Sequence, residues 1–127
     1  MKLQQLVEPK FRNSLGKALK ATISGTASWK LAKLTKQLEQ ELTDYNGTRE
    51  ELLKKFADKD DAGEPILTEG VYQLSADALK TYAEEHDALL KQDIEVKTSI
   101  KISELGDLGK IEFSAEDFMN LDQIIVE

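Results

Sequence analysis

The longest regular pattern in this 127-residue chain occupies residues 29–56, WKLAKLTKQLEQELTDYNGTREELLKKF. Its large apolar residues recur every three or four positions, which places them on one face of an α-helix. They are Leu31, Leu34, Leu38, Leu42, Tyr45, Leu52 and Phe56. The lysines lie mostly off that face, as in an amphipathic helix that packs on a protein core. Since Tyr45 and Leu52 stay in phase, we expect one helix over residues 29–57, with Gly47 as the place where it would bend.

Weaker patterns on both sides of this helix predict the remaining elements. Pro9 begins a short helix with Phe11, Leu15, Ala18 and Leu19 on its apolar face, and residues 22–28 form a connector ending in a Ser or Thr cap. Residues 66–67 and 71–74 flank a Thr-Glu-Gly turn and predict a short β-hairpin or paired extended segments. Ser75 caps a helix with Leu79, Tyr82, His86, Leu89 and Leu90 on its apolar face.

The last third of the chain predicts a strand and a closing helix. Residues 93–102 alternate between polar and apolar side chains, the pattern of a half-buried strand. Ser114 to Asp117 has the spacing of a capping box and opens a helix with Phe118, Leu121, Ile124 and Ile125 facing inward. We therefore expect an α+β fold, in which a short helix packs on a long amphipathic helix, followed by a small β-hairpin and strand layer with two further helices.

The formal net charge of -7 is unevenly distributed along the chain. Residues 1–57 hold 11 Lys and Arg against 6 Asp and Glu, whereas residues 58–127 hold 6 against 18. The length predicts a single domain over 1–127, with a basic helical hairpin-like part at 1–57 and an acidic α+β part at 58–127. Because an acidic chain is a poor generic binder of phosphate backbones, we do not expect nucleic acid as a partner.

Residue counts exclude several kinds of chemistry. Cys is absent and His86 is the one histidine, which removes disulfides, thiolate zinc sites, Cys nucleophiles and sites needing two imidazoles. No Gly-rich phosphate loop and no catalytic triad order is apparent, so we expect no enzyme and no cofactor. No apolar run reaches the roughly 20 residues that span a bilayer, and the start of the chain lacks an apolar signal core. We expect a protein made and kept in a reducing cytoplasm, without a membrane partner.

The start of the long helix is the candidate interface. Trp29, the one tryptophan, is followed at regular spacing by Lys30, Lys33 and Lys36. Such a segment can lie on an anionic membrane or a phosphate backbone, although the acids that follow on the same helix would be repelled. Packing of Trp29 against the first helix is the more ordinary alternative, and an oligomer contact comes second.

Two further features have competing interpretations. Asp58 to Glu69 places Asp, Asp, Gly and Glu at positions 1, 3, 6 and 12 of a calcium loop, but Ala62 and Pro65 depart from that pattern, and a solvated acidic turn explains the same residues. His86 could act as a general base or pH switch. Since no nucleophile is apparent for it, a place at the edge of the core or in an interface is the stronger interpretation.

Several of these segments together resemble a family of uncharacterised small phage and prophage proteins. The resemblance lies in Ile23 to Leu34 (ISGTASWKLAKL), Leu38 to Leu42, Arg49 to Phe56, the acidic turn and the segment from Leu105 to Ile125. It implies a phage origin and a non-enzymatic role, and it carries over no functional residue. We expect a phage structural or assembly protein, such as a minor virion, connector or decoration component, whose partners are other phage structural proteins or itself. It would be present in the host cytoplasm during synthesis and then in the virion.

An alternative from another class is a host-directed inhibitor or anti-defence protein. Its acidic half would occupy a basic surface of a host protein, because an acidic surface can mimic phosphate for a basic cleft.

Overall fold

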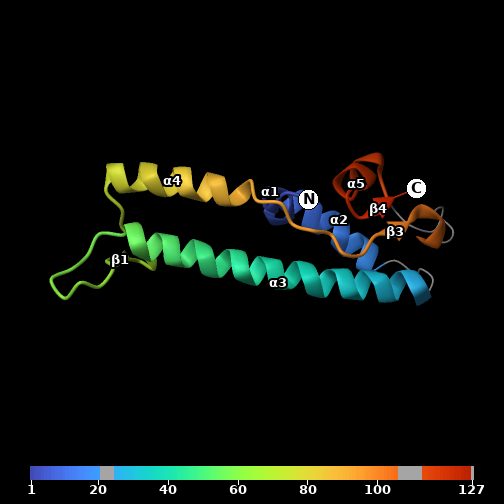
Figure 1. Ribbon diagram of the computed structural model, residues 1–127, viewed down its shortest axis with the longest axis horizontal. Coiled ribbons are helices and arrows are strands. Elements are labelled where there is room, and N and C mark those ends of the chain that lie inside the picture. Colours follow the sequence, from blue (N-terminus) through green and yellow to red (C-terminus); the bar gives the residue numbers. More distant parts are fainter. Residues whose placement is uncertain (21–24, 106–112, 127) are drawn as a thin grey trace. The chain divides into compact units, whose positions relative to one another are not determined.

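Residues 1–20, 25–105 and 113–126 are described in a computed structural model of the chain (Figure 1). The elements are α1 (Leu3–Val7), α2 (Pro9–Lys20), α3 (Gly25–Phe56), β1 (Leu67–Thr68), β2 (Val71–Tyr72), α4 (Ala76–Leu90), β3 (Ile100–Lys101), a 3-10 helix η1 (Ile102–Leu105), α5 (Ala115–Asn120) and β4 (Ile125–Val126). The expected α+β class and the order of its elements are confirmed; the short helix α1 was not predicted.

The long helix is continuous and begins before the predicted start. α3 runs from Gly25 to Phe56 without interruption at Gly47. Residues 25–28, expected in a connector, form its first turn, and residues 21–24 lie outside the described part. The earlier start follows from packing, because Ala27 is fully buried one turn before Leu31. Tertiary burial of this kind overrides the weak helix propensity of a Gly-Thr-Ala-Ser sequence.

The chain divides into two units by its internal contacts. The first unit is Met1–Leu42 with Asp93–Glu127, and the second is Thr43–Gln92. This division does not follow the charge boundary at residue 57. The first unit carries 11 basic and 12 acidic residues, and the second carries 6 and 12. The segments before Leu42 and after Gln92 therefore nearly neutralise each other within one unit, and the net negative charge belongs mainly to the second.

The first unit contains nearly all of the core found in the described residues. α2 packs closely on α1 and α5, and β3 pairs with β4 in parallel, with Ile100 opposite Ile125. The buried apolar side chains of this unit are Leu3, Leu6, Phe11, Leu15, Ala18, Ala27, Leu31, Leu34, Leu38, Ile94, Ile100, Leu105, Leu121, Ile124 and Ile125. Leu19 was expected on the apolar face of α2 but is 47% exposed, because it lies one position past the buried Ala18.

The predicted strand at 93–102 is largely an extended segment without a ladder. Burial alternates as expected from Ile94 to Ile102, but regular pairing is limited to Ile100 and Lys101. In place of a neighbouring strand, the side chain of Gln37 donates to the carbonyl of Glu95 and accepts from the N–H of Lys97. One amide from α3 thus satisfies a donor and an acceptor that a β-ladder would otherwise pair.

The closing helix is shorter than predicted. Ser114 caps α5 and forms a reciprocal capping box with Asp117, as expected, but the helix ends at Asn120. Ile124 and Ile125 are buried, as predicted, although Ile124 lies in a turn and Ile125 in β4. The carbonyl of Ile124 accepts from the N–H of Ile100 at 2.8 Å, so this β-branched end joins β3 in place of another helical turn.

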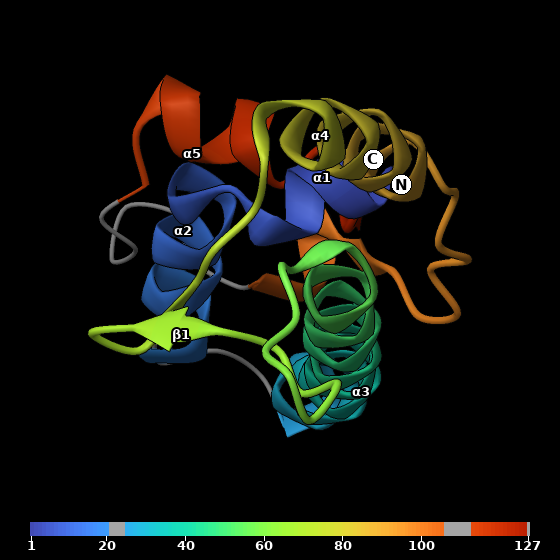
Figure 2. The ribbon, with the colours of Figure 1, turned by 90° about the vertical axis from the view of Figure 1, so that its left-hand side faces the viewer.

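The second unit consists of the end of α3, a β-hairpin and α4. Figure 2 views it from the hairpin end, with the C-terminal half of α3 and α4 both seen along their axes. β1 and β2 pair antiparallel around Glu69 and Gly70, both with positive φ (51° and 79°), as in a type I′ turn. Ser75 caps α4 through the N–H of Ala78, as predicted. Ala57 is the one buried apolar residue described in this unit, and α4 contains none.

Candidate protein-contact site

The candidate interface forms an exposed stripe on the first turns of α3. Ala27, Leu31 and Leu34 face the core, which leaves positions 29, 33 and 36 on the outward side of the helix. Trp29 is 61% exposed, so the expectation that it packs against the first helix is wrong. Lys33 Nζ lies 4.3 Å from the centroid of the Trp29 ring, within the range of a cation–π contact. We call Trp29, Lys33 and Lys36 the Trp29 face.

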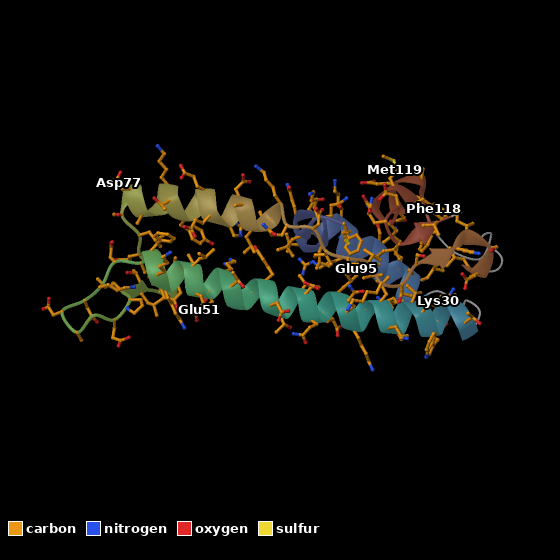
Figure 3. The ribbon with its side chains drawn as sticks, viewed as in Figure 1. Lys30, Glu51, Asp77, Glu95, Phe118 and Met119 are labelled. Carbon is orange, nitrogen blue, oxygen red and sulfur yellow. The ribbon has the colours of Figure 1, made fainter. Side chains whose placement is uncertain are left out.

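Lys30 does not belong to the Trp29 face. Its ammonium group donates to both carboxylate oxygens of Glu104, at 2.9 and 2.8 Å, and joins α3 to η1. The hydrogen bond from Lys30, with a second from the N–H of Lys101, holds the pKa of Glu104 below its usual value. Figure 3 marks Lys30 near the start of α3. Of the four predicted interface residues, three share an exposed surface and the fourth forms an internal ion pair.

A groove in the second unit offers a different kind of surface. It has a volume of about 370 Å³, which lies within the usual range of about 300–1,000 Å³ for ligand pockets. It is lined by α3, the hairpin and α4, through Arg49, Glu50, Leu53, Gly70, Val71, Tyr72 and Tyr82. We call it the hairpin groove. Val71 is 67% exposed at its edge, and Tyr72 donates its hydroxyl proton to Glu50, which raises the pKa of Tyr72.

His86 occupies a half-buried position between α4 and the end of α3. Its Nε2 lies 2.7 Å from the hydroxyl of Tyr45, and the ring of Tyr82 stacks on it with an interplanar angle of 13°. Burial is the main cause of a raised pKa at Tyr45. These contacts hold the two helices together, consistent with His86 at the edge of a core. Sequence reasoning identified Tyr45 and Tyr82 as apolar-face residues and missed their contact with the imidazole.

The acidic turn is closed by its own carboxylate. Asp60 Oδ1 accepts from the N–H groups of Ala62 and Glu64 at 2.9 and 3.0 Å, and the segment leaves the turn as β1. The carboxylate caps the backbone of the turn, and the chain leaves it as a strand and not as the helix that follows an EF-hand loop, so the geometry fits the solvated turn. Within residues 1–20, 25–105 and 113–126, no three carboxylate or imidazole groups are placed to share a metal ion.

The most extensive polar network was not predicted. Asp117 is buried and accepts from Ser14 Oγ at 2.7 Å, from Lys17 Nζ at 2.8 Å and from the N–H of Ser114 at 3.0 Å. The Lys17 bond, followed by that from the Ser114 N–H, places the pKa of Asp117 far below its usual range. Ser14, a polar residue among the apolar positions of α2, was the available signal. Because every one of these bonds is internal, the network pins α5 to α2.

Comparison with known proteins finds no matching family model, no matching curated protein and no matching solved structure. The described helices also include none with the length and apolar character needed to cross a membrane.

Proposed function

We propose that this protein is a non-enzymatic contact protein of a phage, acting as a minor virion, connector or decoration component. The observation that supports this most directly is the exposure of the lone tryptophan. A Trp side chain buries a large area when it docks, and Trp is enriched among the residues that dominate binding energy. Trp29 is 61% exposed, and it lies beside two lysines, Lys33 and Lys36, that form no ion pair within the described residues.

The second unit adds to this argument. Leu67 and Val71 of the hairpin are each more than half exposed, and Ala57 is the one buried apolar residue among those described in this unit. A unit with so little buried apolar surface gains stability when a partner covers it. Contact surfaces on both units suit a subunit that is held between neighbours in an assembly.

The test is the composition of purified particles of the phage that encodes the chain. The protein should be present at a fixed copy number by quantitative mass spectrometry, and Trp29→Ala should reduce that number. Met119→Ala is the matched control, because Met119 on α5 is 72% exposed (Figure 3) and belongs neither to the Trp29 face nor to the residues that line the hairpin groove. Absence of the wild-type protein from particles would refute the structural role.

The host-directed inhibitor is the second candidate, favoured by the acidic excess of the second unit, which has 12 acidic against 6 basic residues. Such a surface could cover a basic cleft of a host protein. Affinity capture from infected cells separates the two proposals. A host nuclease or nucleotide-handling enzyme recovered at stoichiometric amount, with virion proteins absent, would favour inhibition over assembly.

A further inference from the structure

We infer that the Trp29 face of one copy docks into the hairpin groove of a second copy, so that the chain associates head to tail. This inference rests on the proposed contact function and names the partner. The two surfaces differ in shape and chemistry. The Trp29 face presents an aromatic knob, and the hairpin groove presents a hollow with Tyr72, Tyr82 and Leu53 in its lining.

The groove has partners for each group of the knob. An indole prefers offset or edge contacts with other aromatic rings, which Tyr72 and Tyr82 supply, and Arg49 can lie over its face. The Glu50 carboxylate at the rim can receive an ammonium group from the docked face. A contact of this kind combines a buried aromatic anchor with a charged rim, the usual arrangement of a binding hot spot.

Charge selects this pairing over a symmetric one. The second unit has a net charge of -6, so two second units brought together would repel each other. If two Trp29 faces met, Lys33 and Lys36 of one copy would lie opposite Lys33 and Lys36 of the other, and these like charges would repel. Docking unlike surfaces brings these lysines to the acidic unit. A contact between unlike surfaces leaves one of each free at the ends, so it extends into a ring or a filament.

The single tryptophan reports this contact directly. In wild-type protein, raising the concentration should shift Trp29 emission to shorter wavelength and protect it from acrylamide, in step with an increase in mass by sedimentation. Raising the salt concentration from about 0.05 M to 0.5 M should weaken the association, because the lysine contacts at the rim are screened.

Two blocked variants test which surfaces meet. Trp29→Ala removes the knob, and Val71→Lys places a cation at the exposed edge of the groove facing the incoming lysines. Each variant alone should lose about 30-fold or more in association constant, the effect expected for a hot-spot residue. Leu79→Lys, on an exposed position of α4 outside the groove lining, is the matched control and should associate as wild type does.

The decisive measurement mixes the two blocked variants. Only Val71→Lys then carries a tryptophan, and only Trp29→Ala retains an open groove, so the mixture should form a 1:1 dimer and restore the emission shift. Three results would each overturn the inference. They are a mixture in which neither the mass nor the Trp29 emission changes, a wild-type protein that stays monomeric at all concentrations, and a loss of association constant in Leu79→Lys equal to that in the blocked variants. Circular dichroism of each variant checks that it is folded. Particle composition is measured separately, so failure here leaves the virion role standing, and the reverse also holds.

Discussion

Gly47→Ala should stabilise the protein, and the structure sets the magnitude. Gly47 lies in the interior of the continuous helix α3, and it is exposed. A Cβ built at this position meets no heavy atom within 4 Å, so the new methyl group causes no clash and fills no cavity. What remains is the helix propensity difference between Ala and Gly, about 0.8–1.0 kcal/mol.

Thermal and chemical unfolding followed by far-UV circular dichroism give the measurement. For a chain of this length, a gain of about 1 kcal/mol corresponds to a rise in Tm of about 3–5 °C. The matched control is Gly70→Ala in the hairpin turn. Gly70 has φ of 79°, a conformation that costs an L-residue about 1–2 kcal/mol, so the same chemical change should lower stability there.

An unchanged or lower Tm for Gly47→Ala would refute the reasoning. It would mean that the chain at this position is bent or non-helical in solution, as the sequence alone allowed. A gain at Gly47 together with a loss at Gly70 would establish that α3 is helical through this point, and that the two glycines serve different purposes.

Three more outcomes follow from the contacts described above. Gln37→Ala should lower the free energy of unfolding by about 1 kcal/mol in urea titrations, because it removes both hydrogen bonds to the extended segment; a neutral result would show that water replaces the amide. Glu69→Asn should raise Tm slightly, since Asn tolerates the positive φ of this turn position better than Glu, and a fall in Tm would contradict that assignment. The lowered pKa of Asp117 contributes stability that is present above its ordinary pKa of 3.8 and is lost as the pH falls toward the folded-state value. Acid should therefore destabilise the wild type below about pH 4, and Asp117→Asn should be less stable at pH 7 with the difference shrinking toward pH 2; a constant difference would count against the ionised contact.

Local patterns predicted the elements well where one physical effect dominated. The three-to-four spacing of Leu31, Leu34 and Leu38 correctly gave the buried face of α3, and Ser75 correctly marked the start of α4. The predictions failed where a distant partner decided the outcome. The side-chain amide of Gln37 takes the place of a neighbouring strand beside the extended segment. The end of the predicted last helix is instead β4, which pairs with β3. A prediction from residues that are neighbours along the chain cannot identify either partner.

The candidate site shows the same division. Spacing along the helix correctly grouped Trp29, Lys33 and Lys36 on one side of α3, because that depends on helix geometry alone. It could not separate Lys30 from them, since the partner of Lys30 is Glu104, 74 positions later in the chain. The hairpin groove was beyond prediction for a similar reason, because three separate segments line it.

The ion pairs change what the basic first third of the chain can do. Lys2, Lys17 and Lys30 are paired with Asp93, Asp117 and Glu104, all from the segment after residue 92. Acids of the same unit pair with these three lysines, so the three do not add to a broad basic surface. Lys33 and Lys36 remain beside an exposed tryptophan, a combination of one apolar anchor and two charges. An interface of this kind should weaken in high salt without dissociating completely, because salt screens the lysines and leaves the burial of the indole unchanged.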